Sequence, residues 1–150
     1  MRIRPVEIIA LLARVAVGSV LLYAGFLKAL SPAAEFAAVL EAYKLFPSSL
    51  LTPLSIGLPY VEMWVGLFML TGFCTRVAAL AATILSCAFL TTVGSALLRG
   101  IDLAHCGCFG PQSLTPRHTM VLDVALLLFS MIVFRVAKLP PLLSLDRSIP

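Results

Sequence analysis

The uninterrupted run Val77–Leu98, VAALAATILSCAFLTTVGSALL, decides the fold class of this chain because it contains no charged residue. An α-helix rises about 1.5 Å per residue. Roughly 20 apolar residues are therefore enough to cross the hydrocarbon core of a bilayer. The length and composition of this run predict a membrane-spanning helix.

The composition of the whole chain agrees with this run. Of the 150 residues, 61% are hydrophobic and 12% are charged, and the mean hydropathy is +1.06. Soluble domains are about 45–50% apolar and about 25% charged. The formal net charge is +4, but the basic residues form no cluster of the kind that binds nucleic acid. The composition predicts an integral membrane protein whose surroundings are a lipid bilayer and which has no nucleic-acid partner.

Three further segments are long and apolar enough to cross a bilayer. Pro5 suits the first turn of the first segment, Gly72 suits the end of the second, and Pro140 stops the fourth. We therefore predict an all-α fold, an integral membrane four-helix bundle that forms a single domain over residues 1–150. The predicted spans are about residues 7–27, 54–73, 77–98 and 119–137.

A short amphipathic helix is predicted between the first two spans. The stretch SPAAEFAAVLEAYKLFP, residues 31–47, places apolar residues at i, i+3, i+4 and i+7, which lie on one helical face. We expect a helix at about residues 32–46 that lies at the membrane interface; a plain connector is the alternative. The residues of the apolar face are Phe36, Val39, Leu40 and Tyr43.

The basic residues predict the orientation of the spans. Four spans place both termini on the same side of the membrane, and cytoplasmic loops carry the larger share of Lys and Arg. We therefore expect a multi-pass protein of the bacterial inner membrane with cytoplasmic termini and a periplasmic loop between the third and fourth spans. The terminal side holds Arg2, Arg4, Arg76, Arg135, Lys138 and Arg147, and the other side holds Lys28, Lys44, Arg99 and Arg117.

The loop between the third and fourth spans contains HCGCFG, residues 105–110, and with it two of the four cysteines. Cys106 and Cys108 are close enough in sequence to form a small disulfide ring, and Gly107 allows the bend. A strained disulfide is oxidising and labile, which suits exchange. His105, when protonated, would favour the attacking thiolate. We predict that these three residues, His105, Cys106 and Cys108, are the catalytic group.

Three other interpretations of this loop stay open. They are a structural disulfide, which would close almost no loop, a metal site, and free thiols without a shared role. The metal site would use His105, Cys106, Cys108 and His118, although its cysteine spacing is tighter than is usual for zinc. Cys74 and Cys87 lie too far from the loop to exchange with it directly.

Ionisable residues inside the spans are functional candidates. Glu62 and Asp123 each lie roughly 5–10 Å below the outer surface, by the rise of a helix, and Lys28 could neutralise either. We predict a polar, cofactor-binding pocket formed by Tyr23, Lys28, Glu62 and Asp123. A simple salt bridge between helices is the alternative. Arg14 is too deep to reach Glu62, and we expect it to extend toward the cytoplasmic headgroups or to pack locally.

The chain resembles the DoxX-like membrane proteins in YAGFLKALSP, residues 23–32, and in LPYVEMWVGLFMLTG, residues 58–72. CGCFG, residues 106–110, followed by Arg117 and the fourth span, is similar to the MauE branch, the methylamine utilisation proteins. The resemblance covers residues 8–138. It implies a four-helix inner-membrane protein that supports maturation of the disulfide-rich small subunit of methylamine dehydrogenase, together with a periplasmic thioredoxin-like partner.

The resemblance leads to a functional hypothesis. The architecture is also similar to DsbB and the vitamin K epoxide reductases, which pass thiol electrons to a quinone, but those proteins use C-x-x-C and a second cysteine pair that this chain lacks. A quinone cofactor is therefore an expectation by analogy. We expect a thiol–disulfide oxidoreductase of the membrane. The alternatives are a docking or chaperone-like subunit, a metal-binding loop and a transporter.

Overall fold

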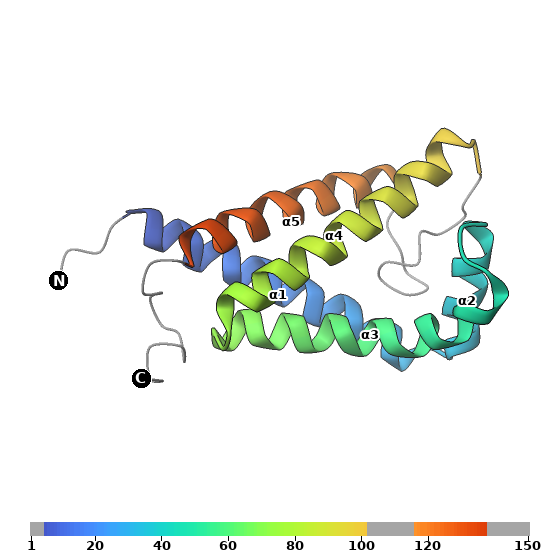
Figure 1. The fold of residues 1–150 in the computed structure, drawn as a ribbon, viewed down its shortest axis with the longest axis horizontal. Coiled ribbons are helices and arrows are strands. Elements are labelled where there is room, and N and C mark those ends of the chain that lie inside the picture. The colour runs from blue at the N-terminus through green and yellow to red at the C-terminus, as the bar shows by residue number, and fades with distance from the viewer. Residues whose placement is uncertain (1–4, 102–115, 138–150) are drawn as a thin grey trace.

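A computed structural model of the chain describes residues 5–101 and 116–137. Four of its helices are long and apolar enough to cross a membrane, and no strand occurs within these two ranges. The predicted all-α membrane bundle, with a short helix after the first span, is confirmed (Figure 1). The helices are α1 (Pro5–Leu30), α2 (Ala33–Ala42), α3 (Ser48–Thr71), α4 (Thr75–Leu98) and α5 (Pro116–Val136).

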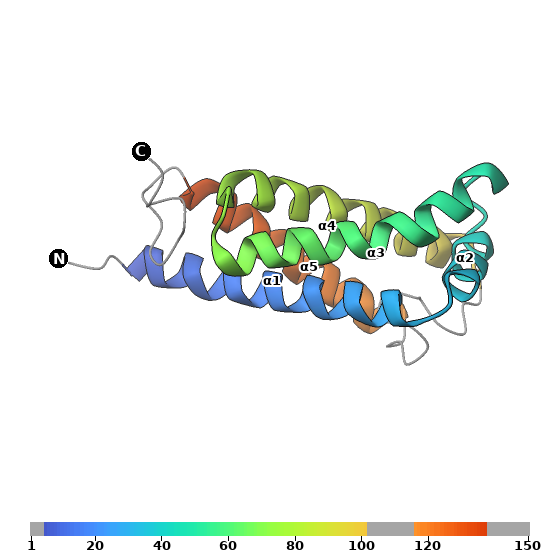
Figure 2. The same ribbon diagram turned by 90° about the horizontal axis from the view of Figure 1, so that it is seen from below.

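The four long helices run alternately in opposite directions along the bundle, and α2 lies across one end of it (Figures 1 and 2). We refer to this end as the α2 end. The first turn of α1 and the last turn of α5 lie at the opposite end. In Figure 1, α3 and α4 adjoin at the turn that connects them and diverge toward the α2 end.

Two helix boundaries differ from the prediction by four residues or more. Helix α3 begins at Ser48 rather than near residue 54, because Pro47 starts it with an extended backbone and the helix then accommodates Pro53 and Pro59 in its interior. Helix α2 ends at Ala42 rather than near residue 46. The reason is that Lys44 has a left-handed backbone (φ +52°), which cannot continue a right-handed helix.

Glycines allow α1 and α3 to pack closely. A Cβ atom on Gly66 would lie 2.6 Å from the backbone nitrogen of Leu22, and one on Gly18 would lie 2.9 Å from the carbonyl oxygen of Gly66. Both distances are too short for a side chain. Small residues at such positions let membrane helices approach each other, and van der Waals contact then holds them together.

Small residues also line the contact between α4 and α5. Ala79 and Ala82 of α4 are fully buried, and the hydroxyl of Thr83 donates a hydrogen bond of 3.0 Å to the hydroxyl of Ser130 on α5. The buried apolar core extends from this contact across the bundle to α1 and α3. Its larger members are Val17, Leu21, Met69, Leu85, Leu126 and Val133.

A second apolar cluster joins three elements at the α2 end. Tyr43, at the end of α2, packs with Val93 and Ala96 of α4, and Ile101 and Met120 border them. The Arg99 guanidinium donates a hydrogen bond of 2.5 Å to the Tyr43 carbonyl oxygen, which fastens the end of α2 to the end of α4. The residues on either side of the segment 102–115, Ile101 and the start of α5, both lie at this end of the bundle.

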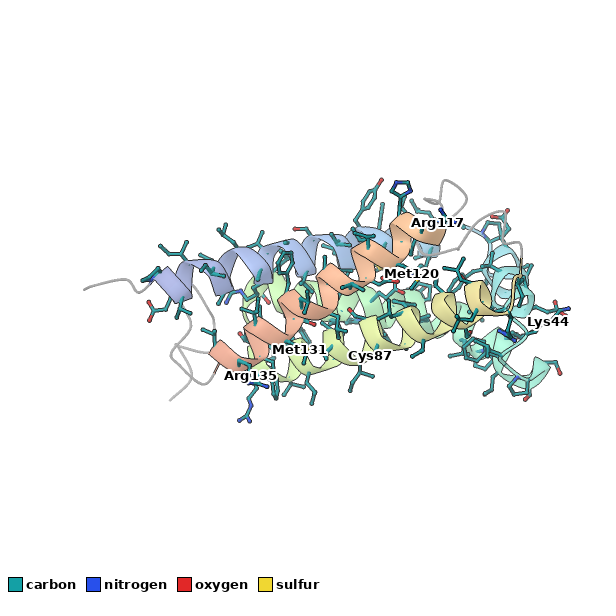
Figure 3. All side chains as sticks on the ribbon, turned by 90° about the horizontal axis from the view of Figure 1, so that it is seen from above. Lys44, Cys87, Arg117, Met120, Met131 and Arg135 are labelled. Carbon is teal, nitrogen blue, oxygen red and sulfur yellow. The ribbon has the colours of Figure 1, made fainter. Side chains whose placement is uncertain are left out.

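Three described basic residues lie at the ends of the bundle to which the span count assigned them. Lys44 and Arg117 lie at the α2 end, whereas Arg135 lies at the opposite end (Figure 3). Which of these ends faces the cytoplasm stays a prediction from the charge count.

Candidate functional site

The predicted catalytic residues His105, Cys106 and Cys108 lie outside the described residues. The structure does place the helix ends on either side of them, because α4 ends and α5 begins at the α2 end (Figure 1). His118, the fourth residue of the alternative metal site, is exposed in the first turn of α5.

The other two cysteines lie away from the α2 end. Cys74 is exposed in the turn between α3 and α4, at the opposite end of the bundle. Cys87 is an exposed free thiol on the outer surface of α4 (Figure 3). It precedes the last residue of α4 by 11 positions, which is about 16 Å along the helix.

An ion pair between α1 and α3 is buried near the α2 end. The ammonium nitrogen of Lys28 lies 2.5 Å and 2.6 Å from the two carboxylate oxygens of Glu62, and the two side chains are 2% and 0% exposed. Close packing of the helices allows this pairing: a Cβ atom on Gly25 would lie 2.6 Å from the carbonyl oxygen of Pro59 and 3.0 Å from Cβ of Glu62. Glycine at position 25 thus brings Glu62 within reach of Lys28.

Two aromatic rings from other helices face the same ammonium group. The Lys28 nitrogen lies 4.9 Å from the ring centroid of Phe89 on α4 and 5.5 Å from that of Phe36 on α2. The negative faces of aromatic rings attract cations, most strongly where water is excluded. Lys28 is therefore the point at which α1, α2, α3 and α4 meet.

A pocket of about 140 Å³ opens beside Lys28, and we call it the Lys28 pocket. Its walls are almost entirely apolar and aromatic. The side chains come from four helices and from Phe46, in the turn after α2. The lining residues are Lys28, Phe36, Leu40, Tyr43, Phe46, Leu54, Leu58, Leu85, Ala88, Phe89, Thr92 and Val93.

The four residues of the predicted polar pocket lie on three helices, α1, α3 and α5. Lys28 and Glu62 are in contact, as described above. Asp123 is buried on α5, 3% exposed, but it is not among the residues that line the Lys28 pocket. Tyr23 is 59% exposed and borders a separate shallow groove with Phe26 and Leu70. Because each helical residue turns by about 100°, the five positions from Tyr23 to Lys28 place the two side chains on different faces of α1.

Arg14 is also buried, on the core face of α1. Of the two predicted alternatives for this residue, the structure favours local packing, since a side chain that extends to the headgroups would be exposed at its tip.

Two residues of the candidate site, Phe36 and Phe89, were not predicted from the sequence. Phe36 was identified only as part of the apolar face of α2, and Phe89 has no distinguishing pattern in an apolar run. The hydrophobic periodicity of α2 indicated that Phe36 faces another element, but not that this element carries Lys28.

The fold and the buried ion pair define the class of this protein: a polytopic α-helical membrane protein with a small apolar pocket near one end of its bundle. The chain belongs to the MauE family, since the family described as "Methylamine utilisation protein MauE" matches residues 6–136. This membership implies a bacterial membrane protein with a role in methylamine utilisation. Comparison with curated proteins and with solved structures gives no match.

Proposed function

We propose that this protein serves methylamine utilisation as a membrane thiol–disulfide redox protein. Cys106 and Cys108 alternate between a dithiol and a disulfide and exchange with a periplasmic thioredoxin-like partner. The observation that carries the proposal is the Cys-Gly-Cys spacing in a chain of the MauE family. The proposal also draws support from the fold, since the helices on either side of this segment meet at one end of the bundle.

The exchange balances as a two-electron reaction. A thiolate of the reduced partner attacks one sulfur of the Cys106–Cys108 disulfide and forms a mixed disulfide, which releases the other cysteine as a thiolate. The second thiol of the partner then attacks the mixed disulfide, leaving the partner oxidised and both cysteines reduced. The strain of so small a ring favours this direction, because strained disulfides have higher reduction potentials.

Replacement of the two cysteines tests the proposal. A Cys108→Ser variant should accumulate a mixed disulfide when its Cys106 thiolate attacks the disulfide of the oxidised partner, because Cys108 is no longer present to displace the partner from Cys106. Non-reducing electrophoresis detects that adduct. The double variant Cys106→Ser/Cys108→Ser should trap no partner and should lose maturation of the target protein. Cys74→Ser/Cys87→Ser is the matched control and should behave as the wild type, because both residues lie away from the α2 end.

Full maturation in the Cys106→Ser/Cys108→Ser variant would contradict the redox proposal. That result would identify a docking or chaperone-like subunit instead. Thiols that stay reduced in an oxidising medium, together with zinc that co-purifies in proportion to protein, would identify a metal-binding loop.

A further inference from the structure

The Lys28 pocket is accessible from the lipid. Its lining includes Leu54 and Leu58 of α3 and Ala88 and Phe89 of α4. Ala88 is exposed, and it precedes the last residue of α4 by ten positions, which is about 15 Å along the helix. The hydrocarbon core of a bilayer is about 30 Å thick, so the rim of the pocket at Ala88 faces acyl chains.

The charge at the pocket favours a neutral ligand. Among the described residues that line the pocket, only Lys28 carries a formal charge at neutral pH, and its charge is balanced by Glu62 at 2.5 Å and 2.6 Å. A phosphate or carboxylate group would have to displace Glu62, which is completely buried and would lose its partner. A cation would meet the ammonium group directly.

The volume and walls of the pocket fit a single ring. A cavity of about 150 Å³ lined by Leu, Ile and Phe is large enough to bind benzene, and the Lys28 pocket measures about 140 Å³. Phe36 and Phe89 supply two aromatic walls. Aromatic rings prefer to meet other rings in offset or edge-to-face contact, so the walls favour a flat ring over a flexible acyl chain.

Lys28 also supplies a hydrogen-bond donor. An ammonium group carries three N–H donors and no acceptor. The two contacts with Glu62 use two of these donors. The third donor suits a carbonyl oxygen on the ring of the ligand, and a hydrogen bond from a charged donor is stronger than one between neutral groups.

We infer that the Lys28 pocket is the binding site for the head group of a neutral, single-ring, membrane-soluble quinone. This inference deepens the proposed function, because closure of the Cys106–Cys108 disulfide releases two electrons and two protons. A quinone takes up two electrons and two protons as it becomes a quinol, so the two half-reactions balance. Lys28 hydrogen-bonds one ring oxygen, and Phe36 and Phe89 hold the ring.

The test measures binding of duroquinone, a single-ring tetramethyl quinone, to full-length protein in nanodiscs of quinone-free phosphatidylcholine. Ala88→Phe should weaken binding by about tenfold or more because it closes the lipid-facing rim. Ala16→Phe is the matched control on an exposed position of α1 that does not line the pocket, and it should bind as the wild type. Lys28→Gln/Glu62→Gln keeps the pocket neutral and should also weaken binding by about tenfold, because the charged donor is lost.

Binding is measured in the Cys106→Ser/Cys108→Ser background as well as in the wild type, so that the two proposals can fail separately. Equal binding in both backgrounds supports the pocket whether or not the cysteines exchange with a partner. Duroquinone binding that Ala88→Phe and Lys28→Gln/Glu62→Gln both leave unchanged would overturn the inference. Displacement of bound duroquinone by equimolar palmitate would also overturn it, since it would identify an acyl-chain site.

Discussion

At the scale of single residues, the central feature is the pairing of Lys28 with Glu62. The sequence left two partners open for Lys28, and the structure selects Glu62, because Gly25 removes the side chain that would separate α1 from α3. A buried ion pair is weak evidence of net stability, but removal of one partner leaves an uncompensated buried charge. Replacement of either residue alone is therefore expected to destabilise the protein more than replacement of both.

A double-mutant cycle tests this pairing. Lys28→Met should reduce the free energy of unfolding by about 3–5 kcal/mol, because Glu62 loses its partner in the bundle interior. The double variant Lys28→Met/Glu62→Leu should recover most of that loss, since two apolar side chains can replace a buried pair at little cost. The free energy of unfolding of each variant is measured in detergent micelles from the loss of the helical circular dichroism signal. The single variant Glu62→Leu completes the cycle. Losses in Lys28→Met and Glu62→Leu that add up to the loss in the double variant would show that the side chains act independently.

At the scale of elements, the helix-helix contacts determine where the candidate site forms. The close approach of α1 and α3 brings Lys28 and Glu62 together, and the pocket lies beside Lys28 between side chains of α1, α2, α3 and α4. Helix α2 closes the pocket with its apolar face, on which Phe36, Leu40 and Tyr43 are all buried. Phe36, Leu40, Tyr43 and Val39 were predicted to share one face, and the structure confirms that they pack on the bundle.

Two glycines of α3 provide a matched test of the α1–α3 contact. Gly66→Ala should lower the free energy of unfolding by about 1–3 kcal/mol, because the new Cβ would lie 2.6 Å from backbone atoms of α1 that cannot turn aside. Gly57→Ala, in the same helix, has open space around its Cβ and should stabilise the protein by about 0.5–1 kcal/mol. The same unfolding measurement serves for both. An equal effect at the two positions would contradict the packing described for Gly66.

The sequence predicts features that depend on neighbouring residues in the chain. It does not predict which side chains of separate helices come into contact. Span length and the apolar face of α2 depend on residues near one another in the chain, so hydropathy and periodicity identified them. The pocket walls depend on how separate helices lie beside one another, and nothing near Phe89 in the sequence indicates that it faces Lys28. Tyr23 was predicted to share a pocket with Lys28, but the helical rotation between them places it on another face of α1, where it is exposed and borders a separate groove.

At the scale of the whole molecule, several chemical features gather at the α2 end. The buried ion pair, the Lys28 pocket and the ends of the helices that flank the Cys-Gly-Cys segment all lie toward this end. The opposite end carries the turn at Cys74 and the basic residues Arg76 and Arg135. This asymmetry is the arrangement expected of a protein that performs its chemistry at one membrane surface and uses the bundle to hold a lipid-soluble carrier nearby.

The most direct test of the central claim is the stoichiometry between thiols and quinone in a purified Cys74→Ser/Cys87→Ser variant. This variant retains two of the four cysteines, Cys106 and Cys108. After reduction and transfer to quinone-free nanodiscs, addition of duroquinone should convert both thiols into an intramolecular disulfide and should form one quinol for each pair of thiols lost. Thiols that stay fully reactive toward a maleimide, with no quinol formed, would contradict the account.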